Sequence, residues 1–130
     1  MVIDTSALVA ILQDEPERRA LTDAILTASS PRMSAATLVE AGIVMQGRHG
    51  DVGSRDLDVL LSQTRVEVVP LTAAHADFAR DAFRRFGKGR HPAGLNYGDC
   101  FAYALATALA EPLLFVGSDF DQTDVAAAVY

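Results

Sequence analysis

Four short candidate strand segments, separated by longer stretches with helical periodicity, constrain the fold of this chain most. The segments are residues 2–4, 32–34, 66–69 and 113–116, and the last is bounded by Pro112 and Gly117. β-Branched residues dominate the segment 66–69, as is typical of strands. Strands that alternate with helices predict a parallel sheet with helices on both faces. We therefore expect an α/β fold.

Capping and breaking residues place the helices between those strands. The expected helices cover about 6–13, 16–28, 34–47 and 97–110, and two more begin at the capping residues Ser54 and Thr72. Glycines mark two loops, at 50–53 and 87–94. The second loop also carries basic residues.

The length of 130 residues favours a single domain over 1–130, because a chain of this size can bury about two thirds of its unfolded surface. The composition, 50% hydrophobic and 22% charged, argues against disorder. The one cysteine, Cys100, excludes an internal disulfide and fits a reducing cytoplasm. No stretch approaches the roughly 18 apolar residues of a membrane span, and no basic region precedes the apolar start. We therefore expect neither a signal peptide nor a membrane association.

Four acids stand beside apolar segments. Asp4 and Asp119 follow expected strands, whereas Glu40 and Asp99 lie on expected helices. Ordinary structural roles are open for three of them: Asp4 as a helix cap, Asp99 in a capping box with Asn96, and Asp119 as a turn residue. Glu40 is harder to explain in this way, because its helical neighbours are mostly apolar and an unpaired buried carboxylate is costly. A partly exposed position at the rim of the apolar stripe is its ordinary alternative.

The acids together indicate a chemistry that none of them indicates alone. Ligands of α/β folds bind at the carboxyl ends of parallel strands. If the acids converge, each pair about 5 Å apart repels by roughly 3 kcal/mol at an effective dielectric constant of about 20. A divalent cation removes that cost, and oxygen ligands favour Mg²⁺ or Mn²⁺. A cation held with open positions suits the attack of water on a phosphodiester.

Four motifs resemble, in order and spacing, those of PIN-domain nucleases, and more closely those of VapC-type toxins of bacterial toxin–antitoxin pairs. They are residues 2–7 (VIDTSA), Glu40 in the helix over 34–46, residues 95–100 (LNYGDC), and residues 115–120 (FVGSDF) with Thr123 and Asp124. The likeness covers the whole chain. The first motif is weak by itself, whereas residues 87–100 followed by the Gly-Ser-Asp-Phe turn are specific.

The resemblance implies an α/β/α sandwich and Mg²⁺-dependent endoribonuclease activity on an RNA substrate. It also implies a homodimer and inhibition by a VapB-type antitoxin. Metal ligation is carried over to Asp4 and Asp99, and roles in the acidic site to Glu40 and Asp119. Ser118 departs from the pattern, since many members have a second acid there, so the number of metal ions, one or two, is open.

Basic residues precede the motif that contains Asp99. Arg84, Arg85, Lys88 and Arg90 lie within a short run, in a chain with 11 Lys plus Arg and a net charge of −6. This run offsets the acidic average locally and predicts phosphate contacts and salt-sensitive RNA binding, with a solvated loop as the alternative. Three polar residues that could instead cap helices are further candidate substrate contacts: Thr5, Ser6 and Asn96.

Two other functions compete with this interpretation. A PIN-like binding module without catalysis fits the departure at Ser118, and RNA that is bound but never cut would indicate it. A phospho-accepting receiver domain has a similar length and an acidic pocket. It needs an acidic pair after the first strand and a lysine late in the chain, but Asp4 is followed by Thr5 and the only lysine is Lys88.

Overall fold

Four parallel strands form the central sheet, in a computed structural model that describes residues 1–130. The strands are β1 (Val2–Ile3), β2 (Arg32–Ser34), β3 (Glu67–Val69) and β4 (Leu113–Leu114), in the order β3-β2-β1-β4. Val2 of β1 pairs with Arg32 on one side and with Leu113 on the other. The strand order therefore reverses between β1 and β4. Such a switch point opens a crevice at the carboxyl ends of the strands.

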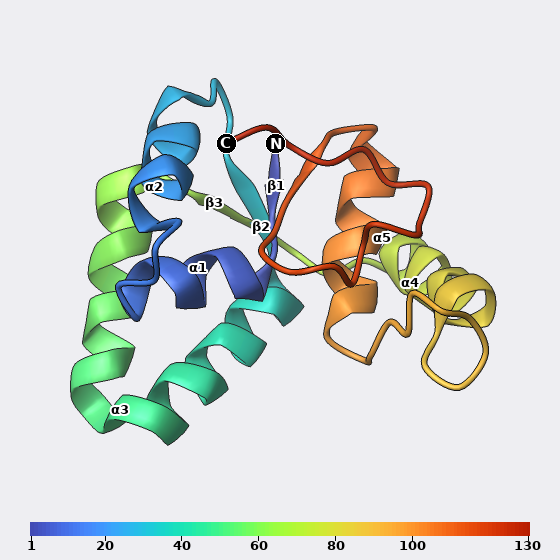
Figure 1. The fold of residues 1–130 in the computed structure, drawn as a ribbon, viewed down its shortest axis with the longest axis horizontal. Coiled ribbons are helices and arrows are strands. Elements are labelled where there is room, and N and C mark those ends of the chain that lie inside the picture. Colours follow the sequence, from blue (N-terminus) through green and yellow to red (C-terminus); the bar gives the residue numbers. More distant parts are fainter.

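Helices cover both faces of the sheet (Figure 1). α1 (Thr5–Leu12), α2 (Arg18–Thr27) and α3 (Ala35–Thr64) pack on one face, and α4 (Ala73–Phe86) and α5 (Asp99–Leu109) on the other. Successive strand residues point to opposite faces: Ile3 and Leu114 join the core beneath α1 to α3, whereas Val2 and Leu113 join the core beneath α4 and α5. This arrangement confirms the expected α/β/α sandwich.

Element boundaries follow the local signals closely, with one clear error. β2 covers the expected residues, and Thr72 caps α4 as predicted. The loop predicted at 50–53 was wrong, because α3 continues through it and only Gly50 leaves helical geometry, with φ 62° and ψ −151°. Gly53 packs so closely there that a Cβ would lie 2.6 Å from the Met45 carbonyl oxygen. Two glycines thus make a tight kink instead of a loop, and Ser54 lies inside the second arm of α3 rather than capping it.

Some apolar side chains remain exposed on the outer helices. An apolar groove of about 620 Å³ lies between α4 and the start of α5, lined in part by Phe83, Tyr97 and Phe101. Tyr97 is 81% exposed beside it. None of the helices has the length and apolar character needed to cross a membrane.

Candidate active site

A cavity of about 360 Å³ lies at the carboxyl ends of β1 and β4. Side chains from α1, α3, the start of α5 and the turn after β4 meet there, so the fold brings together residues from distant parts of the chain. All four predicted acids are among them. The lining residues are Asp4, Thr5, Ser6, Val9, Glu15, Glu40, Val44, Arg48, Asn96, Asp99, Val116 and Asp119.

Asp4 is buried at the junction of β1 and α1, with one carboxylate oxygen unpartnered. Its Oδ2 caps α1 by accepting hydrogen bonds from the backbone amide (2.9 Å) and the hydroxyl (2.6 Å) of Ser6. Ser6 Oγ also accepts a hydrogen bond from the Val116 amide (3.0 Å), which ties the end of β4 to the same corner. Asp4 Oδ1 has no partner, and burial is the main cause of the raised pKa of Asp4. Capping therefore uses one oxygen and leaves the other free.

Asp99 begins α5 in a reciprocal capping box with Asn96. The Asp99 amide donates to Asn96 Oδ1 (3.0 Å), and the Asn96 amide donates to Asp99 Oδ2 (2.7 Å). Burial raises the pKa of Asp99 to about 6, although the hydrogen bond from the Asn96 amide opposes that rise. The charges of Asp4, Asp119 and Glu40 make a smaller contribution to the same rise. The reciprocal hydrogen bonds predicted for Asn96 and Asp99 are confirmed, although Gly98 rather than Asn96 directly precedes α5. The Asp99 carboxylate also lies within the field of the other acids.

Glu40 enters the cavity from the first arm of α3. Its Oε2 accepts a hydrogen bond from Thr5 Oγ1 (2.6 Å). Gly98 lies so close to this carboxylate that a Cβ there would be 1.9 Å from Glu40 Oε1. Gly98 has φ −65° and ψ −44°, which any residue can adopt, so space rather than backbone conformation requires glycine. The start of α5 is thus shaped to admit the Glu40 carboxylate.

Asp119 is the exposed member of the four acids and lies in the turn after β4. Gly117, at φ 100°, allows the chain to turn there. Phe120 is buried against Phe115, with ring centroids 5.0 Å apart, and anchors the turn to the core. Ser118 is exposed and does not line the cavity.

The sequence matches a known family over almost its whole length. The family model of the PIN domain matches residues 1–126. Over 127 residues the chain is 54% identical to Ribonuclease VapC of Mycolicibacterium smegmatis, covering 98% of both chains. It is 50% identical over 126 residues to Ribonuclease VapC30 of Mycobacterium tuberculosis, covering 97% of this chain and 96% of that one. The chain belongs to the PIN-domain family, among the VapC ribonucleases.

Solved structures share the fold of this PIN domain at low sequence identity. The crystal structure of VapC20 from Mycobacterium tuberculosis, a toxin that cleaves the sarcin–ricin loop, gives a TM-score of 0.79 at 15% identity and covers 99% of this chain and 98% of that chain. VapBC2 from Rickettsia felis, bound to a DNA fragment from its promoter, gives 0.77 at 14% identity, covering 99% and 97%. These likenesses support the α/β/α sandwich.

The acids of this PIN domain fit a divalent cation by their chemistry. They offer only oxygen ligands, which Mg²⁺ and Mn²⁺ prefer. Asp4 Oδ1 is a buried acceptor without a donor, and repulsion among the acids helps to raise the pKa of Asp99. No three acidic, histidine or cysteine side chains converge into a preassembled cluster. Mg²⁺ usually takes only one or two carboxylates directly, and the unpartnered Oδ1 of Asp4 suits such a contact.

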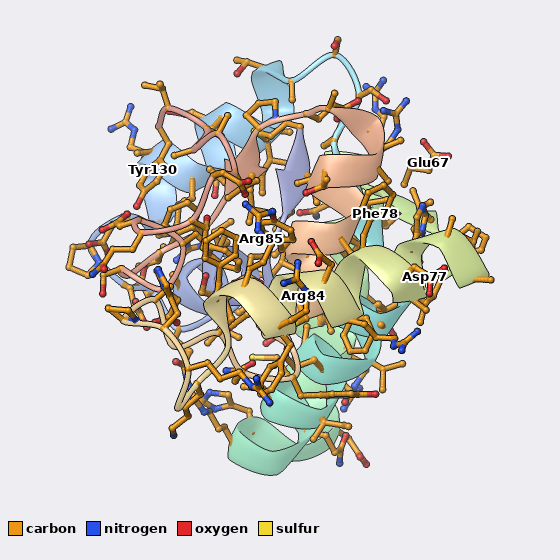
Figure 2. The ribbon with its side chains drawn as sticks, turned by 90° about the vertical axis from the view of Figure 1, so that its right-hand side faces the viewer. Glu67, Asp77, Phe78, Arg84, Arg85 and Tyr130 are labelled. Carbon is orange, nitrogen blue, oxygen red and sulfur yellow. The ribbon has the colours of Figure 1, made fainter.

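The predicted basic contacts lie apart from this cavity. None of the four lines it: Arg84, Arg85, Lys88 and Arg90. Arg84 forms an ion pair with Asp81 (2.6 Å), and Arg85 forms one with Asp124 (2.6 Å). Figure 2 shows both arginines on α4. Their contact with a substrate stays a prediction, as does that of Lys88 and Arg90.

Three residues of the site were missed in the sequence. Arg48 follows Glu40 and Val44 at intervals of four residues, so the helical spacing carried a signal that they share one face. Glu15 reaches the cavity from the turn after α1, where nothing in its neighbours marked it. Gly98 could not have been found, because its need for space arises from Glu40, far away in the sequence.

Proposed function

We propose that this PIN domain is an endoribonuclease toxin that hydrolyses RNA phosphodiester bonds with Mg²⁺, for which Mn²⁺ can substitute. The observation that carries the proposal is the buried, unpartnered Oδ1 of Asp4 in a cavity that also contains Asp99, Glu40 and Asp119. The relatives named as VapC ribonucleases support the reaction class. In this proposal Asp4 and Asp99 hold the cation, and Glu40 and Asp119 complete the acidic site.

The protein's part in the reaction is to hold charged groups in place before the substrate arrives. When bound, a divalent cation supplies an activated water and offsets the charge that develops on the leaving oxygen. Glu40 uses Oε2 to accept the hydrogen bond from Thr5 and keeps Oε1 available to accept a proton from the attacking water. The water oxygen bonds to phosphorus as the bond to the 3′ oxygen breaks, and the leaving 3′ oxygen takes a proton from solvent. The products then carry a 5′-phosphate and a 3′-hydroxyl.

Cleavage of RNA by the purified protein tests this function. We expect cleavage with Mg²⁺, none in excess EDTA, and recovery when Mg²⁺ or Mn²⁺ is restored. Sequencing of the RNA ends should find 5′-phosphates and identify the cleavage site. Full cleavage in excess EDTA, or a cyclic phosphate product, would overturn the metal mechanism. RNA that is bound but never cut, across a broad RNA pool, would indicate the binding module instead.

A VapB-type antitoxin is the proposed protein partner. Two of the solved structures with this fold are a VapBC assembly and a toxin–antitoxin complex from Klebsiella pneumoniae, which supports such a pairing. The groove between α4 and α5 can accept the apolar face of a partner helix, with Phe83 and Tyr97 as contacts. A basic side chain of the partner placed among the acids would compete with the cation.

Co-purification tests the antitoxin pairing. We expect a small open reading frame immediately upstream of the gene, and its product should co-purify with this chain and inhibit it. Phe83→Glu should abolish co-purification while RNA cleavage persists, because Phe83 lies outside the acidic cavity. Co-purification that is unchanged by Phe83→Glu would place the antitoxin elsewhere.

We also propose that the protein is a homodimer and acts in the cytoplasm, where RNA and antitoxin meet it. Val39 and Ile43 on α3 are 61% and 68% exposed, and with Tyr97 they line an apolar hollow beside Glu40. A second copy that covers this hollow would remove apolar surface from water. Light scattering should give twice the monomer mass for the wild type and the monomer mass for Ile43→Asp.

A further inference from the structure

Arg48 is an unpaired cation in an otherwise acidic cavity. It is the one basic residue among those that line the cavity. No carboxylate lies within ion-pair distance of its guanidinium, although five acids line the same space. Its contact is with a neutral group instead, because Nη1 donates a hydrogen bond to Gln13 Oε1 (2.8 Å). Its positive charge is therefore available to an anion that enters the cavity.

Gln13 holds this guanidinium from the end of α1. The Gln13 amide nitrogen lies 3.2 Å from His49 Nε2. An amide nitrogen can only donate, so His49 Nε2 accepts this hydrogen bond. With its nitrogen toward His49, the Gln13 amide group turns Oε1 toward Arg48. His49 and Arg48 are neighbours on α3, so Gln13 bridges the two helices and orients the arginine.

We propose that Arg48 binds a phosphate that flanks the scissile phosphate of an RNA strand, and that Gln13 is its positioning residue. This inference rests on the proposed ribonuclease function, because it names how the same site holds its substrate. Arg48 and Glu40 are eight residues apart on one helix face, which places their backbones about 12 Å apart along the axis. In this proposal, Arg48 therefore lies beside the reacting phosphate rather than on it.

The charge balance of the cavity explains why such a contact is needed. An RNA strand that enters meets carboxylates, which repel its phosphates. A guanidinium offers paired N–H donors that match phosphate geometry, and its contact with a flanking phosphate is made equally before and during the reaction. Such uniform binding lowers KM without changing kcat. Arg48 is thus a substrate-binding residue that differs from the acids in its kinetic signature.

Kinetics of Arg48→Ala on an RNA oligonucleotide that carries the mapped cleavage site test the contact. Because hydrogen bonds to charged groups contribute about 1.5–3 kcal/mol, KM should rise at least about tenfold while kcat stays within about twofold. The slope of log(kcat/KM) against log salt is negative, and Arg48→Ala should make it less steep by about 0.7, the value for one phosphate contact on a single strand. Arg48→Lys should recover part of the loss, and Gln13→Ala should raise KM less than Arg48→Ala.

Arg55→Ala is the matched control, because Arg55 is an exposed arginine on the second arm of α3 that does not line the cavity. It should leave KM and the salt slope unchanged. Arg48 is also exposed, so circular dichroism melts of Arg48→Ala should match the wild type. An unchanged KM and slope in Arg48→Ala would overturn the inference. A KM defect of Arg48→Ala that disappears when the Mg²⁺ concentration is raised would also overturn the inference, because Arg48 would then only balance the charge of the acids.

Neutral methylphosphonate linkages, placed one at a time beside the cleavage site, locate the contact. The wild type should lose affinity at one flanking position, and Arg48→Ala should show no further loss there. Equal losses for both proteins at every position would overturn the inference. Binding of the same oligonucleotides in EDTA, followed by fluorescence anisotropy, keeps the two proposals separate. A wild type that does not cleave would sink the proposed function, whereas equal binding by wild type and Arg48→Ala would sink the Arg48 contact.

Discussion

Two groups of carboxylates in this molecule are in opposite electrostatic states. In the cavity, Asp4 and Asp99 are buried near other acids, and burial raises the pKa of both. Near the end of the chain, Asp124 accepts hydrogen bonds from Tyr103 (2.5 Å) and Arg85 (2.6 Å), and these contacts, led by that of Tyr103, lower its pKa. The second group is satisfied within the chain, whereas the first lacks a positive partner. Acids held against their own repulsion indicate a ligand, and acids with partners indicate structure.

Asp4→Asn should produce the largest difference in RNA cleavage between the acids of the cavity and Asp124. Asparagine keeps the shape of the side chain and can still accept from Ser6, but it removes the charge that attracts a cation. We expect kcat/KM for RNA to fall at least about 1000-fold, because metal charge stabilisation contributes several kcal/mol and each 1.4 kcal/mol is tenfold. Asp124→Asn is the control and should cleave like the wild type once its folded fraction is matched. Equal activities for the two variants would contradict the idea that the cavity acids bind a ligand whereas Asp124 has a structural role.

Gly98→Ala should give the next largest effect by moving one acid without changing its charge. The added Cβ would collide with Glu40 Oε1, and a displaced catalytic group can cost about 100-fold in rate. The backbone of Gly98 accepts alanine, so the protein should fold normally. Gly42→Ala is matched, since nothing lies within 4 Å of a Cβ there, and it should keep full activity and gain about 0.5–1 kcal/mol of stability. Full activity in Gly98→Ala would show that the position of Glu40 is unimportant.

Asp99→Asn should change the pH dependence of stability. The folded pKa of Asp99 is about 6, against an ordinary value of 3.8, so between those pH values the folded protein keeps a proton that the unfolded chain has released. The free energy of unfolding should therefore fall as pH rises through this window, by up to about 3 kcal/mol. In EDTA, thermal melts should show a stability gain for Asp99→Asn at pH 7.5 and a smaller gain at pH 5. A stability gain of equal size at both pH values would show that the titration of Asp99 is not the cause of the pH dependence.

Tyr103→Phe should have the smallest effect, which should appear only in the free energy of unfolding. The change removes the hydroxyl that donates to Asp124 and keeps the ring in the core. We expect a loss of about 1 kcal/mol in urea unfolding and no change in RNA cleavage below the melting range. Tyr130→Phe, at an exposed tyrosine, is the control and should change neither quantity. A selective loss of cleavage in Tyr103→Phe would link the satisfied group to the reaction.

Much of the fold could be predicted because its signals are local. The four strands, the cap at Thr72 and the capping box of Asn96 with Asp99 all depend on residues within a few positions of one another. The prediction of a loop at 50–53 was wrong because a local signal was overridden by a packing contact. Gly50 and Gly53 are loop signals by themselves, but the close contact of Gly53 with Met45 lets the chain form a kink within α3.

By itself, the sequence determined the parallel sheet, the positions of the acids at strand and helix ends, and the net charge of −6 of the chain. Each of these follows from periodicity, capping preference or composition. Only the tertiary structure decided that Asp4 keeps one oxygen free, that Gly98 makes room for Glu40, and that Arg48 lies in the cavity rather than the basic run at the end of α4. The physical reason is that burial, steric space and electrostatic fields depend on atoms brought together from distant parts of the chain.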